Sequence, residues 1–150
     1  MKFFTSAIMG TLTLLATAAI AQEPAVMEKA SIYDGPGRAA AMVARDAKEF
    51  ARMTEVFGKD RLPPKLNFKQ YLVAAVSMGQ RRTGGYAVTI LETEDREGIL
   101  YIRYRERTPG HGEFVTQALT SPYHAKLLPA GTSEKVLFEK VCEPEIHEPD

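Results

Sequence analysis

Residues that could do acid–base, nucleophilic or metal chemistry are few in this chain and are poorly spaced for it. The histidines are His111, His124 and His147, and the single cysteine is Cys142. They form neither the i, i+4 histidine pair nor the Cys-x-x-Cys spacing that zinc sites use. The sequence therefore predicts no metal site and no cofactor.

A serine hydrolase is the catalytic alternative that the residue types permit on paper. Ser77, His111 and Asp95 supply the three members of a triad. The chain has no Gly-x-Ser-x-Gly elbow to present the serine as a nucleophile. Its Gly84-Gly85 pair lies between predicted strands, not before a helix where it would cradle a phosphate. We therefore expect no catalytic residues.

The stretch from Gly79 to Tyr86 has the residue types of a recognition loop. It reads Gly-Gln-Arg-Arg-Thr-Gly-Gly-Tyr. Paired glycines allow positive φ and let another backbone approach closely. Arginine and tyrosine are residue types that carry interface energy. Two interpretations stay open, a binding loop or an ordinary hairpin loop with Tyr86 in the core.

One amphipathic helix is predicted to begin after Asp46. Asp46 can cap it, and Glu49 three residues on completes a capping box. Gly58 supplies the stop, and the pair Pro63-Pro64 prevents continuation. The apolar residues that recur on one face are Phe50, Met53, Val56 and Phe57.

The rest of the chain is dominated by short strand-like runs. Predicted strands are 31–33, 70–78, 86–92, 98–107, 114–119, 123–128 and 136–138, and 39–44 is ambiguous between strand and helix. Short strands with closely spaced turn signals are typical of an antiparallel sheet that closes on itself. The predicted fold class is α+β, mostly antiparallel sheet, sandwich- or barrel-like, with one amphipathic helix.

Several motifs carry a resemblance to a known family. They are Leu66-Asn67-Phe68-Lys69, Tyr71-Leu72-Val73-Ala74-Ala75-Val76, Gly79-x-Arg81-x-Thr83-Gly84-Gly85-Tyr86-x-Val88-x-Ile90, Pro109-Gly110, and Ala118-x-Thr120-x-Pro122-Tyr123-His124. From about residue 32 to 128 the chain resembles the C-terminal domain of the protease complex subunit PrcB family. Asn67 stands where that family usually has an aspartate.

The resemblance implies a role in binding another protein. The family is named for a subunit that associates with and stabilises a secreted serine protease. It implies a non-catalytic domain that is a subunit or stabiliser of an envelope protease complex. Candidate binding residues are Arg81, Arg82, Thr83, Gly84, Gly85, Tyr86, Pro122 and Tyr123.

Two alternatives to a protease subunit stay open. The Arg82–Tyr86 loop and the Ser121-Pro122-Tyr123 corner are similar to the loops with which chagasin-like inhibitors plug cysteine proteases. A protease inhibitor is therefore one alternative. A small-ligand binder or enzyme with an unseen site is the other.

The first 21 residues are expected to be a secretory signal peptide. Lys2 gives a positive start, residues 3–20 carry no charge, and Ala19-Ile20-Ala21 matches the small-x-small cleavage pattern. We therefore expect a periplasmic or secreted protein that begins at Gln22 and is not inserted in the membrane after cleavage. The expected organisation continues with a flexible segment 22–31, a domain 32–141 and an acidic tail 142–150.

The charge and the cysteine content limit the kinds of partner that are expected. The chain has 19 basic and 19 acidic side chains, whereas nucleic-acid binding calls for a basic excess. We therefore expect no nucleic-acid partner. One cysteine cannot form an internal disulfide, and the sequence leaves open both an intermolecular bridge and the oligomeric state.

Overall fold

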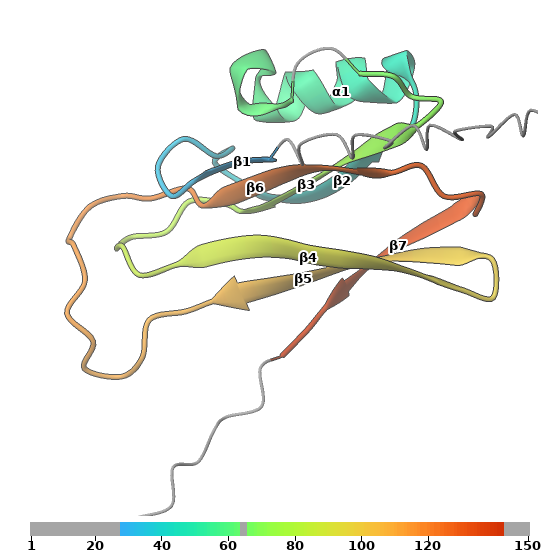
Figure 1. Cartoon of the computed structure of the whole chain (residues 1–150). Helices are drawn as coiled ribbons and strands as arrows, with labels where there is room; N and C mark the ends of the chain where they lie inside the picture. The colour runs from blue at the N-terminus through green and yellow to red at the C-terminus, as the bar shows by residue number, and fades with distance from the viewer. Residues whose placement is uncertain (1–27, 64–65, 143–150) are drawn as a thin grey trace, which may run out of the picture.

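The computed structural model describes residues 28–63 and 66–142. The predicted signal peptide, residues 22–27 and residues 143–150 of the predicted acidic tail lie outside this range. The described residues form three layers, shown in Figure 1. Helix α1 (Ala47–Phe57) covers a four-stranded sheet, which packs on a three-stranded sheet. The predicted α+β class, with a mostly antiparallel sheet and one helix, is confirmed.

The four-stranded sheet lies in the middle layer. It is built from β1 (Glu28–Ser31), β2 (Ala39–Ala44), β3 (Tyr71–Met78) and β6 (Tyr123–Pro129). The order is β1-β6-β3-β2, and all pairs are antiparallel. Strand β3 is covered on both faces, by α1 and by the second sheet. A doubly covered strand reads as a continuous apolar run, which is why β3 is almost wholly apolar.

The three-stranded sheet is built from β4 (Ala87–Arg96), β5 (Ile99–Arg107) and β7 (Lys135–Lys140), in the order β4-β5-β7. Strands β4 and β5 form a hairpin through Glu97 and Gly98, whose φ angles of 53° and 75° are both positive. Two positive φ angles are the requirement of a type I′ hairpin turn. Strand β7 pairs with β5 in parallel, so the chain crosses from the first sheet to the second after β6.

Two apolar clusters hold the layers together. Between the sheets lie Leu72, Ala74, Val76, Met78, Val88, Ile90, Leu100, Ile102 and Leu128. Between α1 and the first sheet lie Ala44, Met53, Phe57, Leu62, Val73, Ala75, Tyr123 and Ala125. Strand β3 alternates between the two clusters, because successive side chains point to opposite faces of a sheet.

Side chains of β6 join the free edge of β4 to the first sheet. The Ile90 N–H donates to Nδ1 of His124 at 2.8 Å, and Nζ of Lys126 donates to the Leu91 carbonyl at 3.0 Å. Both contacts lie at a shift in the β4–β5 register between Ile90 and Thr93. Side chains, in place of a continuous strand ladder, make this junction, so the two sheets form a sandwich.

The helix forms as its local signals predict. The Asp46 side chain accepts from the Glu49 N–H at 2.7 Å, and Gly58 ends the helix with a φ of 82°. The Glu49 carboxylate in turn accepts from the Arg45 N–H at 2.8 Å. Met53 and Phe57 are fully buried beneath it.

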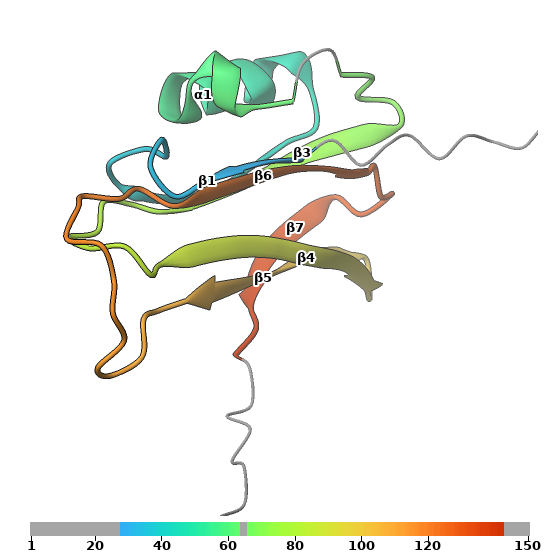
Figure 2. The ribbon, with the colours of Figure 1, turned by 60° about the vertical axis from the view of Figure 1, so that its left-hand side comes forward.

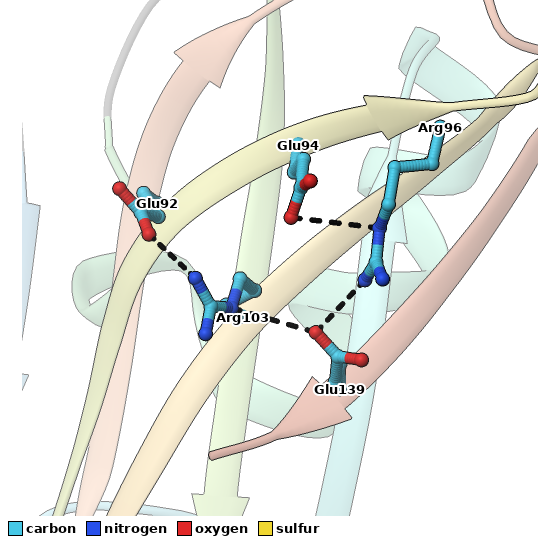
Figure 3. Close-up of polar contacts among 5 residues, drawn as sticks. All are labelled: Glu92, Glu94, Arg96, Arg103 and Glu139. Carbon is cyan, nitrogen blue, oxygen red and sulfur yellow. Dashed lines mark hydrogen bonds and ion pairs between the residues drawn. The ribbon is translucent and has the colours of Figure 1, made fainter.

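Ion pairs cover the outer face of the second sheet (Figure 3). Arg103 lies 2.8 Å from Glu92, and Arg96 lies 3.5 Å from Glu94. Both arginines also contact the Oε2 atom of Glu139 on β7, at 3.0 Å for Arg96 and 3.4 Å for Arg103. Exposed pairs contribute about 0–1 kcal/mol each, so this row defines a polar surface more than it stabilises the fold.

Two predicted strands differ from the structure. Segment 114–119 is not a strand. Its backbone turns toward the preceding β3–β4 connection, where the Thr116 carbonyl accepts from the Gly84 N–H, and Phe114 is fully exposed. The run 31–33 is also not a strand. Strand β1 ends at Ser31 because the Ser31 hydroxyl bonds Asp34 and the Tyr33 N–H, which forms a turn. Strand β1 thus begins at Glu28, inside the segment 22–31 that was expected to be flexible. The ambiguous run 39–44 is strand β2.

Candidate functional site

Three connections meet at one end of the sandwich, which we call the loop end. They are residues 32–38, 79–86 and 108–122, all on the left in Figures 1 and 2. Arg81 and Thr120 exchange backbone hydrogen bonds of 2.7 and 3.0 Å. The Ser121 N–H donates to the Ile32 carbonyl, and the Gly35 N–H donates to the Ser121 carbonyl, both at 2.8 Å. The three connections therefore form one hydrogen-bonded unit.

The paired glycines let the second connection lie directly on the third. A Cβ added to Gly84 would fall 2.4 Å from the Thr116 hydroxyl. Gly85 has a φ of 84°, and a Cβ there would lie 2.7 Å from a methyl group of Val115 and 2.9 Å from Pro109. Side chains are excluded at both positions by the close approach of the neighbouring loop. At Gly84 the neighbouring backbone does come close, because the Gly84 N–H donates to the Thr116 carbonyl at 2.8 Å, whereas at Gly85 the nearest groups are side chains.

Arg107, the last residue of β5, holds the third connection in place. Its guanidinium donates to the Gly85 carbonyl and pairs with Glu113 at 2.6 Å. The Glu113 carboxylate also accepts from the Gly110 N–H at 2.8 Å. The hydrogen bond from Arg107, and then that from Gly110, lower the pKa of Glu113. The carboxylate is therefore held ionised, and it ties the turn at Gly110 to the end of β5.

Arg81 and Tyr86 stack on each other at this end. The Arg81 guanidinium carbon lies 5.5 Å from the centre of the Tyr86 ring, within cation–π range. Tyr86 is half-buried and packs against the cluster between the sheets. The Nε atom of Arg81 is buried, and none of the residues that the structure describes accepts a hydrogen bond from it. Tyr86 therefore contacts both the core cluster and the Arg81 side chain of the second connection.

Pro122 is the last residue of the third connection, and Tyr123 is the first residue of β6. Both are buried, Pro122 fully and Tyr123 with 6% of its surface exposed. Burial raises the pKa of the Tyr123 phenol. Their side chains support the connections from below, and the surface itself is presented by Arg82 and Thr83, which are exposed and half-buried.

Four large apolar side chains are exposed at this end, and none of them was among the predicted binding residues. Exposed fractions are 103% for Phe114, 63% for Leu119, 55% for Tyr33 and 39% for Ile32. Phe114 and Leu119 were assigned to a strand, where alternate residues are buried. The turn signal Asp34-Gly35-Pro36-Gly37, directly after Tyr33, was the one sequence feature that could have placed Ile32 and Tyr33 on a loop.

Positive charge accompanies the apolar residues. Arg82 and Arg38 are exposed. Within residues 28–63 and 66–142, neither arginine has a carboxylate within ion-pair distance. Arg38 directly precedes β2 and lies against Gly79. The loop end therefore carries both arginine side chains and exposed apolar groups, a combination that suits contact with another protein.

The residues considered for catalysis occupy separate environments. The Ser77 hydroxyl is buried and bonds the Pro36 carbonyl and the Gly79 N–H. The Asp95 carboxylate bonds Ser133, and His111 is exposed on the third connection. Among the residues that the structure describes, no group of three or more His, Cys, Asp or Glu side chains could hold a metal ion. No helix in the described part of the chain is long and apolar enough to span a bilayer.

The fold and the loop end define a small β-sandwich whose three connections at one end are hydrogen-bonded to one another. The family model described as PrcB C-terminal matches residues 72–127, from β3 to β6. This match supports a PrcB-family domain and confirms the predicted resemblance over residues 72–127. It includes the whole of the second and third connections. Comparison with curated proteins and with solved structures found no match.

Proposed function

We propose that this chain is an exported, non-catalytic protein-binding domain whose loop end contacts its partner. One observation carries the proposal. Four of the five large apolar side chains exposed in the described residues, Ile32, Tyr33, Phe114 and Leu119, lie at the loop end. An excess of large exposed apolar side chains at one end of a domain is typical of a surface that binds another molecule.

The hydrogen bonds and the ion pair within the loop end favour tight binding. Loops that must be ordered on binding cost affinity, at about 0.5–1.5 kcal/mol per immobilised side chain. Here the backbone bonds between Arg81 and Thr120 and the Arg107–Glu113 pair already hold the connections. Phe114 and Arg82 then present the aromatic and guanidinium groups from which binding hot spots are commonly built.

The proposed partner is a protease of the cell envelope. The family match associates the domain with a protease complex. The signal-peptide pattern of residues 1–21 supports export to the compartment in which such a protease would act. The arginines of the loop end favour a partner surface that carries carboxylates next to an apolar pocket.

A protease inhibitor is the second candidate. Three hydrogen-bonded connections at one end of a sandwich can enter a cleft together as a wedge. The two roles differ in their effect on the partner. A subunit leaves cleavage of a small peptide substrate unchanged or protects the protease from decay. An inhibitor that fills the active-site cleft abolishes cleavage of the same peptide.

Affinity measurements on loop-end variants test the proposal. The partner would be obtained by cross-linking in envelope extract and then purified. We expect Phe114→Ser and Arg82→Ala each to weaken binding about thirtyfold, as for interface anchors worth ~2 kcal/mol. Arg52→Ala is the matched control, because Arg52 is an exposed arginine on α1. Unchanged affinity in both loop-end variants, with intact melting curves, would remove the loop end from consideration.

Export is tested separately by intact-mass measurement. We expect the protein recovered from the envelope or medium to begin at Gln22. A species that retains residues 1–21 in that fraction would contradict cleavage, and a species found with the cytoplasm would contradict export.

A further inference from the structure

The free edge of β7 is open to pairing. Strand β7 ends the second sheet and pairs on its other side with β5. The Val141 N–H donates to the Tyr104 carbonyl of β5 at 2.8 Å. Backbone groups of alternate residues point to the same side of a strand, so those of Glu139 and Leu137 also face β5. The N–H and C=O groups of Val136 and Phe138 therefore face outward, where no described strand meets them.

Leu137 is the apolar exception on this part of the surface. It projects from the centre of β7 on the outer face of the second sheet and is 48% exposed. Its neighbours on the same face of β7 are Lys135 and Glu139, both charged. It is also the one large exposed apolar side chain of the described residues that lies away from the loop end.

The order of charges along β7 is self-complementary. Residues 134 to 140 read Glu-Lys-Val-Leu-Phe-Glu-Lys. Each residue on one side of Leu137 has an opposite charge, or another apolar group, at the same distance on the other side. Lys135 mirrors Glu139, Glu134 mirrors Lys140, and Val136 mirrors Phe138.

We propose that β7 pairs antiparallel with β7 of a second copy of this chain, about a two-fold axis at Leu137. In this register Val136 of each copy lies opposite Phe138 of the other. The outward backbone groups of these residues can then make four hydrogen bonds. The two Leu137 side chains form a non-hydrogen-bonded pair, the kind in which side chains approach most closely. The two three-stranded sheets become one sheet of six strands.

Charge pairing favours this register over its neighbours. Lys135 of each copy lies opposite Glu139 of the other, and opposite charges in directly facing positions stabilise a sheet. The ion pairs of Glu139 with Arg96 and Arg103 both use its Oε2 atom, and Figure 3 shows the other oxygen pointing away from them. That oxygen can accept from the incoming Lys135. A shift of two residues either way would set charged side chains opposite apolar ones.

Lysines on an edge strand often serve to prevent such pairing. On β7 the lysines disfavour pairing in every register that places Lys135 opposite an apolar or basic residue. The two-fold register is the exception, because it gives Lys135 an acidic partner. The lysines therefore favour pairing with a second copy of the chain in this one register.

The assembly is measured by sedimentation velocity of the purified protein between about 1 µM and 1 mM, the range of weak interfaces. We expect a concentration-dependent monomer–dimer equilibrium. Leu137→Arg puts two like charges on the axis and should raise the dissociation constant at least tenfold. Ala51→Arg is the matched control, because it adds the same charge at an exposed position on α1, and it should leave the equilibrium unchanged.

A charge exchange tests the register itself. Lys135→Glu alone puts Glu opposite Glu139 twice per dimer, and Glu139→Lys alone puts Lys opposite Lys135 twice. Each variant should dimerise at least tenfold more weakly than the parent. Mixed together, the two variants form a heterodimer in which both facing pairs are again of opposite charge, so dimerisation should return. Melting curves of each variant confirm that the fold is intact.

Each of the two experiments has an outcome that would contradict the proposed β7 pairing. A protein that stays monomeric to about 1 mM, or a dimer that survives Leu137→Arg, contradicts it. So does a mixture of the two charge variants that stays monomeric. Position 142 of one copy lies opposite 132 of the other, so the two Cys142 residues are apart and the dimer must persist in a reducing buffer. A dimer lost on reduction would be a disulfide dimer and would refute β7 pairing.

Discussion

Gly85 is the position where a single methyl group should do most damage to the loop end. Its φ of 84° is unfavourable for any residue with a Cβ. The Cβ of an alanine would also stand 2.7 Å from Val115 and 2.9 Å from Pro109. Gly85→Ala therefore carries two separate costs, one in its own backbone and one in the packing of the second connection against the third.

The two costs can be separated with a second glycine. Gly98, in the β4–β5 turn, has a similar φ of 75°, but a Cβ there would meet nothing within 4 Å. The positive φ should cost about 1–2 kcal/mol in either variant. Overpacking should add about 1–3 kcal/mol at Gly85 alone. We expect Gly85→Ala to lose about 2–5 kcal/mol of unfolding free energy and Gly98→Ala about 1–2.

Urea denaturation followed by circular dichroism measures both values under one set of conditions. The difference between the two variants reports the packing of the loops. Equal losses in the two variants would refute the argument, because they would mean that the second and third connections do not press on each other in solution. A loss in Gly98→Ala larger than in Gly85→Ala would refute it more strongly.

Three further predictions concern single side chains. Burial lowers the pKa of His124, as does Lys126 nearby, although Glu28 opposes this shift. The neutral form of His124 therefore stabilises the fold fully above about pH 6.5, and this contribution to the unfolding free energy is lost as the pH falls below that value. The urea midpoint should therefore fall between pH 7.5 and 5 in the parent and in the exposed control His111→Gln, and a fall of equal size in His124→Gln would contradict the assignment. Cys142→Ser should change the unfolding free energy by no more than about 0.5 kcal/mol, because the thiol is exposed and unbonded, and loss of folded protein in this variant would show a required bridge. Asp46→Ala should cost about 1 kcal/mol in the same denaturation assay through loss of the cap to Glu49, and no change at all would mean that α1 is held by packing alone.

Elements with local signals could be predicted from the sequence. The helix is specified by residues within a few positions of each other, the Asp46 cap, the Glu49 box and the Gly58 stop, so its bounds were predicted closely. In its first half strand β5 alternates between half-buried and buried residues, as at Leu100 and Tyr101, and it was also predicted. Signals of this kind act within one element and need no knowledge of its neighbours.

Features that depend on distant partners could not be predicted in the same way. The parallel pairing of β7 with β5 and the position of β6 between β1 and β3 are choices among many arrangements of similar strands. Segment 114–119 has strand-forming residues, but its backbone bonds go to the β3–β4 connection. The direction in which a side chain points could not be predicted from the sequence either. Arg82 is exposed as expected of a binding residue, whereas Tyr123, from the same candidate set, is buried.

The position of β6 has a consequence for how the chain can fold. Strand β1, at the start of the described residues, pairs with β6, which comes more than 90 positions later. Until residues 123–129 are available, β1 has no strand beside it, and the edge of β3 that β6 will cover stays open. Contacts between such distant segments slow the search for the native state. We therefore expect the nascent chain to remain without a complete first sheet until its final third has emerged, so that folding is an all-or-none closure of the two ends and does not proceed from the N-terminus onward.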